Sequence, residues 1–252
     1  MRTQQRLIGI IAVLALLLLT GSVPAAVHAK EQHAQDPTVI ATMHAAYYQP
    51  VRTDGVYVVW VVDLPSTTST TTSEIWAASI DERVPFRVAT AVLAGPPALD
   101  AGVVAWTERV PDANPDNTDI RGMVLATRDV LDIETGPAST SLGGISGDIV
   151  VWSERPAGSD YQSPSDIRGR NLATGESLTI AATALDEGNP VIAGTRVAWQ
   201  QRDEASRTVL MCDIASDAVS TPIAQFPDLV STDSGSEQIT GITLEGFEGD
   251  RL

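Results

Sequence analysis

The chain contains four apolar segments that each begin with glycine and end with tryptophan. They are Gly55-Val-Tyr-Val-Val-Trp60, Gly102-Val-Val-Ala-Trp106, Gly147-Asp-Ile-Val-Val-Trp152 and Gly194-Thr-Arg-Val-Ala-Trp199. The tryptophans are separated by 46, 46 and 47 residues. Because the segments are nearly continuous apolar runs, they predict strands that are covered on both faces.

A second element follows each of these segments. Asp119-Ile120-Arg121-Gly122 and Asp166-Ile167-Arg168-Gly169 are near copies of one another, and Glu74-Ile75-Trp76 takes the equivalent place in the first unit. In the fourth unit the segment from Arg207 to Asp213 supplies this element. The repeated spacing predicts a second strand that pairs with each tryptophan strand.

Two more short strands complete each unit. The closing strands are predicted at 84–89, 130–133, 177–181 and 219–224. A short segment before the glycine, such as Pro97-Ala-Leu99 or Pro190-Val-Ile192, predicts an opening strand. The turn Leu172-Ala173-Thr174-Gly175 joins the second element to the closing strand of its unit.

A repeat of about 46 residues with four short strands is the sequence pattern of a β-propeller blade. A β-sandwich also has short strands, but it gives no reason for tryptophan to recur at a fixed period. We therefore predict an all-β fold, a β-propeller of four-stranded antiparallel blades. Four complete blades are expected around Trp60, Trp106, Trp152 and Trp199, with parts of a fifth.

The order of an apolar strand, a polar loop, Asp-Ile-x-x, a Thr-Gly turn and a final strand resembles TolB-like propeller repeats of bacterial secreted proteins. The resemblance covers roughly Gly55 to Ala224 and is one of repeat style. TolB-type blades usually carry Ser-Pro-Asp-Gly before the apolar strand, where this chain has Leu99-Asp100-Ala101-Gly102. The resemblance implies a propeller in an exported protein.

The first 29 residues have the features of a secretory signal. Arg2 and Arg6 precede the apolar run Leu7 to Leu19, and Val27-His28-Ala29 fits a cleavage site before Lys30. An uncleaved anchor is the alternative, but the run is short for a membrane span. The predicted organisation is a signal peptide at 1–29, a linker at 30–36 and the propeller at 37–252.

The ends of the predicted propeller look incomplete. Residues 37–42 resemble the last strand of a blade whose other strands are not at this end. Residues 238–252 resemble the start of a further blade, since Gly249-Asp250-Arg251-Leu252 matches Gly147-Asp148-Ile149-Val150. We therefore expect the propeller to be incomplete at the C-terminus and the chain to be a piece of a longer protein.

The formal net charge is −16, and loss of Arg2 and Arg6 with the signal would make it −18. Such an acidic chain is unsuited to nucleic acid, whose phosphates require basic patches, or to stable binding on anionic lipid. The charge favours solubility outside the cell. The one cysteine, Cys212, lies among apolar residues and predicts a buried thiol. His33 and His44 do not have metal-site spacing.

A Trp-x-Glu-Arg pattern places Glu108 and Glu154 two residues after Trp106 and Trp152. Two carboxylates suggest a glycosidase, but catalytic groups occupy one place, whereas residues that recur in every blade usually hold the blades together. Asp119, Arg121, Asp166 and Arg168 belong to the same repeated, structural set. In an antiparallel pair the arginines would lie near the tryptophans, where stacking or ion pairs are expected.

No catalytic constellation and no cofactor are predicted. The segment Asp112-Ala-Asn114-Pro-Asp116-Asn-Thr-Asp119 has oxygen atoms at alternating positions, as a calcium loop does. It lacks the glycine and the final glutamate of such a loop, so a hairpin loop is the favoured interpretation. Ser231-Thr-Asp233-Ser-Gly235 is an imperfect copy of a sialidase Asp-box.

The loops at 63–73, 109–118 and 155–165 vary in sequence, while the strands around them do not. Variable loops on a rigid scaffold are where recognition normally occurs. The ligand-binding candidates are therefore four loop residues, Asp112, Asp116, Asp160 and Tyr161. We expect a secreted or cell-surface, non-catalytic module that binds a protein or a glycan. The alternative is the propeller portion of an extracellular peptidase or glycosidase.

Overall fold

The computed structural model describes residues 51–66, 70–111, 116–159, 163–204, 206–216, 221–227, 229–232 and 235–238. Within these residues every regular element is a strand, and there is no helix that could cross a membrane. The predicted signal peptide, linker and residues 37–42 lie outside the described residues. Most of the predicted fifth-blade start, at 239–252, does so as well.

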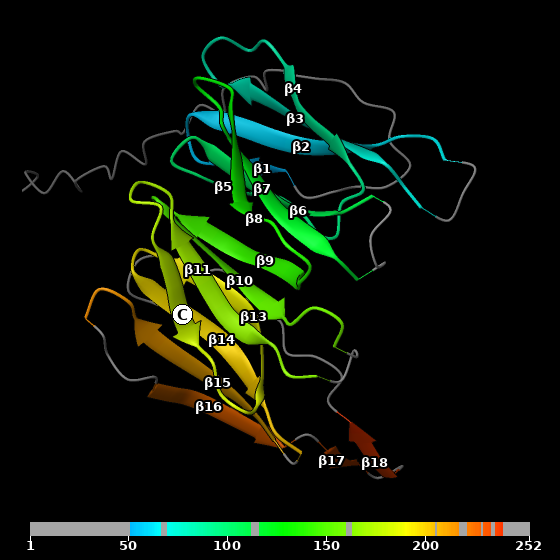
Figure 1. Ribbon diagram of the computed structural model, residues 1–252, viewed down its shortest axis with the longest axis vertical. Coiled ribbons are helices and arrows are strands. Elements are labelled where there is room, and N and C mark those ends of the chain that lie inside the picture. The colour runs from blue at the N-terminus through cyan, green and yellow to red at the C-terminus, as the bar shows by residue number, and fades with distance from the viewer. Residues whose placement is uncertain are drawn as a thin grey trace, which may run out of the picture. The chain divides into compact units, whose positions relative to one another are not determined.

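Four antiparallel sheets of four strands each follow one another along the chain (Figure 1). Blade A contains β1 (Arg52–Thr53), β2 (Tyr57–Asp63), β3 (Ser73–Ser79) and β4 (Phe86–Ala91). Blade B contains β5 (Ala98–Asp100), β6 (Val103–Arg109), β7 (Thr118–Val124) and β8 (Asp129–Glu134). The strand order in both is the chain order, which is the predicted meander.

Blades C and D repeat this arrangement. Blade C contains β9 (Ser139–Ser146), β10 (Ile149–Arg155), β11 (Asp166–Asn171) and β12 (Ser177–Ala181). Blade D contains β13 (Asp186–Ala193), β14 (Arg196–Arg202), β15 (Ser206–Asp213) and β16 (Thr221–Pro227). The prediction of four four-stranded propeller blades is confirmed.

A hairpin follows blade D that the sequence pattern did not indicate. It consists of β17 (Leu229–Thr232) and β18 (Gly235–Gln238). The paired residues Ser231, Thr232 and Gly235 belong to the segment that resembles an Asp-box, and Asp233 lies outside the described residues. The segment is short and polar, so it lacks the apolar run by which the other strands could be recognised.

The register places the repeated residues at equivalent positions. Trp60 pairs with Trp76, Trp106 with Arg121, Trp152 with Arg168 and Trp199 with Leu210. The side chains of the four repeat tryptophans are between 1% and 5% exposed. Residues on both sides of the tryptophan strands are buried, as Val150, Val151 and Trp152 show in succession. The predicted coverage on both faces is confirmed.

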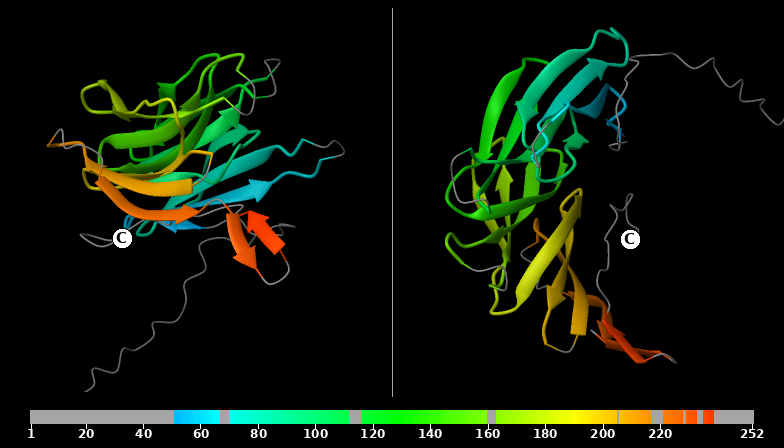
Figure 2. Two further views of the ribbon diagram at one scale, coloured as in Figure 1. Left: turned by 90° about the horizontal axis from the view of Figure 1, so that it is seen from below. Right: turned by 90° about the vertical axis from the view of Figure 1, so that its right-hand side faces the viewer.

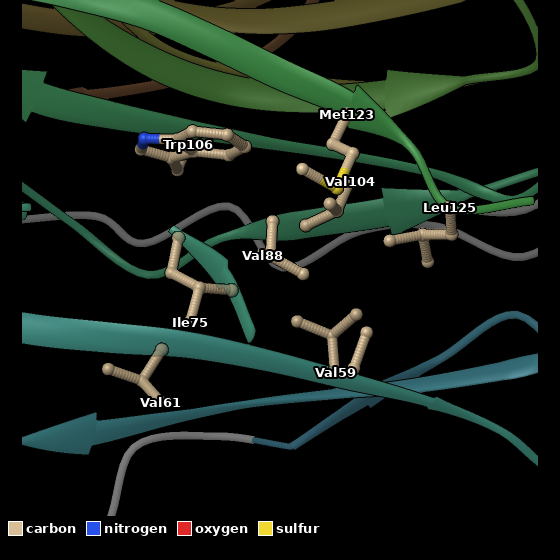
Figure 3. Close-up of a cluster of buried hydrophobic side chains, with 9 residues drawn as sticks. Val59, Val61, Ile75, Val88, Val104, Trp106, Met123 and Leu125 are labelled. Carbon is tan, nitrogen blue, oxygen red and sulfur yellow. The ribbon is translucent and has the colours of Figure 1, made fainter. Parts of the chain in front are cut away.

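The core is divided among the three junctions between consecutive blades. Trp106 packs against Val59, Val61 and Ile75 of blade A, and Figure 3 shows these side chains facing one another. The other two junctions have the same plan, with Trp152 in the B/C cluster and Trp199 in the C/D cluster. Each of these tryptophans therefore fills the space toward the preceding blade.

Consecutive blades also contact through the tight turn before each tryptophan strand. The Gly102 N–H donates to Asp54 at 2.7 Å, the Gly147 N–H to Asp100 at 2.7 Å, and the Gly194 N–H to Ser146 at 2.9 Å. The three donor glycines have positive φ, which explains why glycine recurs there. Consecutive blades lie face to face in chain order in the further views (Figure 2).

Candidate functional site

The Trp-x-Glu-Arg residues form a hydrogen-bonded network inside each blade. In blade B the Trp106 Nε1–H donates to Glu108 at 2.8 Å, and Arg121 pairs with Asp119 at 3.2 Å. Arg121 also lies 3.5 Å from Glu108 and pairs with Asp132 of β8. The network therefore connects three strands of one sheet.

Blade C has the same network at the equivalent positions. Trp152 Nε1–H donates to Glu154 at 3.3 Å, and Arg168 pairs with Asp166 at 2.7 Å. Arg168 also donates to Thr179 of β12 at 2.6 Å. The predicted proximity of tryptophan and arginine is thus present in both blades. These carboxylates are occupied by structural partners, as their repetition suggested.

Blade A builds the same contacts from different strands. Its Trp76 stands where the other two blades have arginine, and its Nε1–H donates to Glu74 at 3.0 Å. The cation comes from the next strand, since Arg87 of β4 pairs with Glu74 at 2.8 Å. These hydrogen bonds hold the pKa of Glu74 below its usual value, with the Arg87 bond contributing most.

Blade D departs from the pattern. Gln201 replaces the glutamate, and its amide donates to Glu187 of β13 at 3.1 Å. Glu187 is fully buried, and Thr183 also donates to it, at 2.9 Å. The second oxygen of Glu187 and the Trp199 Nε1–H have no hydrogen-bond partner among the described residues. Glu187 and Trp199 are buried, whereas Gln201 is half-buried and Thr183 is exposed.

The ends of the blades near the long loops are clamped together at two of the three junctions. Between blades B and C, the Thr140 N–H donates to the Thr118 hydroxyl at 2.7 Å, and the Thr140 hydroxyl donates to the Thr118 carbonyl at 2.8 Å. Between blades C and D, the Ser165 N–H and hydroxyl both donate to Asp186 at 3.0 Å. The Glu187 N–H also donates to the Ser165 carbonyl at 3.0 Å.

The A/B junction lacks this clamp among the described residues. By register, Ser73 corresponds to Thr118, and Leu93 corresponds to Thr140. Leu93 has no side-chain donor or acceptor, and the Ser73 hydroxyl instead donates to Asp63 within blade A at 2.6 Å. The A/B junction therefore differs from the other two junctions at the end of the blades that carries the long loops.

Two adjoining cavities occupy the place of the missing clamp. We name them together the A/B groove. The smaller has a volume of about 270 Å³ and is lined by Asp63, Thr71, Ser73, Leu93, Gly95 and Pro96. The larger has a volume of about 500 Å³ and is lined by Thr70, Thr71, Val92, Leu93, Arg109, Val110 and Pro111. Volumes of this size match small-molecule sites or a few residues of a peptide.

The groove contains parts of two of the three predicted recognition loops. Thr70 and Thr71 come from the 63–73 loop, and Val110 and Pro111 from the 109–118 loop. Sequence reasoning identified these loops but not the wall residues Val92 and Leu93. The sequence signal that could have identified this wall is an apolar residue, Leu93, at a repeat position where the other blades have the polar residues Thr140 and Glu187.

Of the four predicted ligand-binding residues, the described structure includes one, Asp116. Asp112, Asp160 and Tyr161 lie outside the described residues. Asp116 is exposed and lies in the same loop as Val110 and Pro111. The assignment of these four residues to ligand binding stays a prediction.

Asp119, the last residue of the calcium-like segment, is held by protein groups. The carboxylate of Asp119 accepts from Arg121 at 3.2 Å and from the Gly136 N–H at 3.3 Å. No group of three or more His, Cys, Asp or Glu residues that could hold a metal ion occurs in the described part of the chain. Asp112 and Asn114 lie outside that part, so the metal prediction is untested.

No family model matches the chain, and no curated protein sequence does. Solved structures do match. The acylaminoacyl peptidase of Pyrococcus horikoshii aligns with 77% of this chain at 11% identity and a TM-score of 0.54. The tricorn protease aligns with 75% at 10% identity and a TM-score of 0.52. A putative TolB from Agrobacterium tumefaciens aligns with 69% at 12% identity and a TM-score of 0.48.

These proteins contain β-propellers, so the fold of this chain is a β-propeller. The chain spans 39% of the acylaminoacyl peptidase, 23% of the tricorn protease and 63% of the putative TolB. At these identities the likeness is one of fold alone. What the groove binds has to be argued from its own residues.

Proposed function

We propose that this chain is a secreted, non-catalytic binding module of TolB-like repeat style that recognises a protein segment or a cell-surface glycan in the A/B groove. The observation that carries the proposal is the loss of the inter-blade clamp at Leu93, where two cavities of about 270 and 500 Å³ replace it. Polar contacts that hold two junctions are replaced at the third by a leucine that packs on the core and borders both cavities, which supports a binding role for this junction.

The supporting physical argument is that an open junction costs stability. Clamps such as the one between Thr118 and Thr140 contribute roughly 0.5–1.5 kcal/mol per hydrogen bond. The A/B junction forgoes this contribution and exposes partly apolar walls. A ligand that covers these walls would recover the loss.

The experiment is a binding screen with a variant that fills the groove. Purified protein is applied to arrays of immobilised peptides and of bacterial surface glycans. Thr71→Trp places a large ring between the two cavities, which Thr71 lines on both sides. Ala173→Trp in the exposed β11–β12 turn is the matched control. We expect binding by the wild type and the control, and loss of binding in Thr71→Trp. Equal binding by all three proteins would show that the groove is not the site.

Export is a separate part of the proposal. It is supported by Arg2 and Arg6, the apolar run Leu7 to Leu19 and the small residues before Lys30. The mature protein in the medium or the cell envelope should begin at Lys30, which mass spectrometry of its N-terminal peptide would measure. Recovery of a chain that still begins at Met1 from the cytoplasm would contradict it.

A second candidate function is the propeller portion of an extracellular hydrolase. It is favoured by the fold likeness to two proteins whose names identify them as a peptidase and a protease. In this case the groove would guide a substrate to catalytic residues outside this chain. A peptidase assay on the complete natural gene product, compared with residues 30–252 alone, separates the two functions. Hydrolysis by the former and not by the latter would favour the second candidate.

A further inference from the structure

The backbone of Leu93, which forms an isolated bridge to Glu108 ahead of β5, is placed differently from its counterparts at the other two junctions. Leu93, Thr140 and Glu187 occupy the same register position, opposite the residue two places after each tryptophan. The Thr140 N–H donates to Thr118, and the Glu187 N–H donates to Ser165, so both bind the preceding blade. Among the described residues, the Leu93 N–H has no hydrogen-bond partner.

The backbone around Leu93 aims this N–H away from its own blade. The Ala94 N–H donates to Thr107 at 2.9 Å, and the Arg109 N–H donates to Val92 at 2.9 Å. In antiparallel pairing, a residue flanked by such bonds directs its own N–H and C=O to the opposite edge. At the two clamped junctions the equivalent N–H points at the preceding blade, and here that direction leads into the groove.

The wall chemistry distinguishes between a peptide and a glycan. Val92, Leu93, Val110 and Pro111 give the larger cavity one aliphatic side, and the rest of its described lining is Thr70, Thr71 and Arg109, with no aromatic ring. Sugars are commonly held by stacking on aromatic rings and by several convergent polar side chains. Aliphatic walls beside an extended backbone with an open N–H instead suit an extended peptide, whose carbonyl accepts from that N–H while a side chain enters the pocket.

The charges favour a basic residue in that peptide. Asp63 lines the smaller cavity, and among the described residues its carboxylate accepts a hydrogen bond from Ser73 at 2.6 Å. Arg109 lines the larger cavity, so the basic side chain of a ligand is expected at the smaller cavity and not at the larger one. The whole chain carries a formal charge of −16, which attracts cationic partners over long range.

We propose that the A/B groove binds an extended polypeptide segment, with an aliphatic side chain against Val92 and Leu93, a basic side chain near Asp63, and a backbone carbonyl that accepts from the Leu93 N–H. This proposal rests on the proposed function, because it names the class of ligand for the same groove. The proposed ligand is a peptide, and binding of a glycan in its place is one of the outcomes that the experiment distinguishes.

The test uses Leu93→Thr in the full mature chain. This substitution gives the A/B junction the residue that blade C has at position 140, next to Ser73 in place of Thr118. It removes an aliphatic wall of the groove and places a hydroxyl where the Thr140 hydroxyl of blade C bonds to the preceding blade. Because Leu93 also packs against the A/B core cluster, the melting temperature of the variant is measured beside that of the wild type. The probes are short synthetic peptides that contain one leucine and one lysine at varied spacing, with the same peptides carrying Asp for Lys or Ala for Leu, and an array of bacterial surface glycans.

The expected result is binding of a subset of the Leu/Lys peptides, weakened about tenfold or more by Leu93→Thr, since one hydrogen bond and an apolar contact are lost. Asp63→Asn should weaken the Lys peptides and leave lysine-free peptides unchanged. Ala173→Trp should bind like the wild type. If Leu93→Thr does not fold, Thr71→Trp with the same peptides replaces it.

Three results would overturn the proposal, and they differ in whether the groove remains the functional site. Glycan binding that Thr71→Trp abolishes, without peptide binding, would refute the peptide and keep the groove as the functional site. Peptide binding that neither groove variant changes would refute both this proposal and the proposed function. Failure of every peptide and glycan to bind would also refute both.

Discussion

Asp54 shows how much a single turn residue contributes to the contact between blades. One carboxylate oxygen accepts from Val56 at 2.9 Å and Tyr57 at 2.8 Å, and the other accepts from Gly102 of the next blade at 2.7 Å. Partial burial acts to raise the pKa of Asp54, but the hydrogen bonds from these N–H groups outweigh it and lower the pKa below its ordinary value. The ionised form is therefore the one that the folded state stabilises.

Replacement of Asp54 by alanine should destabilise the protein by about 1 to 2 kcal/mol, because three backbone donors lose a charged acceptor. The effect should depend on pH in a defined direction. Since the pKa is lowered on folding, the stabilisation is fully present above the unfolded pKa of about 4. It is lost as the pH falls through the lower folded pKa.

Urea unfolding from pH 7 down to pH 3 measures this difference. Asp81→Ala, at an exposed aspartate in the β3–β4 turn, is the control and should leave the free energy of unfolding unchanged. A difference between wild type and Asp54→Ala that grows as the pH falls would contradict the hydrogen-bond account.

Cys212 is a second residue whose environment decides its chemistry. It is 8% exposed and belongs to the C/D core cluster with Trp199 and Leu210. Burial, followed by the nearby charge of Asp213, raises the pKa of the thiol above its usual value. The folded protein should therefore react with a thiol reagent at pH 8 much more slowly than the urea-unfolded chain. Absorbance of the released thiolate measures both rates, and equal rates would show that Cys212 is accessible.

The glycines of the Asp-Ile-Arg-Gly copies illustrate what a repeat motif means physically. A Cβ added at Gly122 would lie 3.0 Å from the Val104 carbonyl oxygen, and one at Gly169 would lie 3.0 Å from that of Val150. The sequence showed that these glycines recur. The reason, close contact with the neighbouring strand, required the coordinates.

At the scale of elements, the inner strands of blades C and D contact each other through Gly143. A Cβ at this position would lie 2.3 Å from the Pro190 carbonyl oxygen and 2.5 Å from its Cγ. The register shift in β9 falls at this glycine, and the shift in β13 falls at Asn189 and Pro190. Two bulges therefore pack together where no side chain fits.

Gly143→Ala should destabilise the protein by about 2 kcal/mol or more, because backbone atoms must move to admit the methyl group. Gly144→Ala is a close control, since its Cβ would lie 3.4 Å from Ile192 and further from every backbone atom outside its chain neighbours. Thermal unfolding of both variants, followed by circular dichroism, measures the difference. Equal melting temperatures would show that the close approach of the two strands is relieved at little cost.

The strands themselves were predictable because the tryptophan period and the burial pattern agree. The pairings of Trp106 with Arg121 and Trp152 with Arg168 follow directly from the spacing. The network of blade A was harder to predict from the sequence, because its arginine, Arg87, lies on β4. In blades B and C the arginine lies on the strand that pairs with the tryptophan strand. The contact of Arg128 with the Phe86 ring, at 4.4 Å, crosses a junction and has no sequence signal.

At the scale of the whole molecule, the candidate site could be predicted only in part. The loops 63–73 and 109–118 were expected to carry recognition, and both contribute to the groove. Leu93 was not singled out, because its meaning comes from comparison with Thr140 and Glu187 after the register is known. A hydrogen bond that one junction lacks leaves no recognisable motif in the sequence. Site prediction from a repeat therefore requires attention to positions where a polar residue is missing.

The division of the core into three clusters, one at each junction, has a consequence for stability. Val104 belongs to the A/B cluster and Val197 to the C/D cluster, and blades B and C lie between the two junctions. Both valines are fully buried, so Val104→Ala and Val197→Ala should each cost about 2 kcal/mol. Because the sites share no partner, the double variant should lose the sum of the two within about 0.5 kcal/mol.

A pair within one cluster should behave differently. Val59 and Val104 face each other across the A/B junction in Figure 3, so their alanine substitutions enlarge one shared cavity and need not add. Urea unfolding of both double variants and the three single ones measures the interaction energies. If the distant pair deviates from additivity as much as the neighbouring pair, the junctions are not independent packing units. The groove would then be kept open by the rigidity of all four sheets together, and not by the hydrogen bonds at the neighbouring junctions.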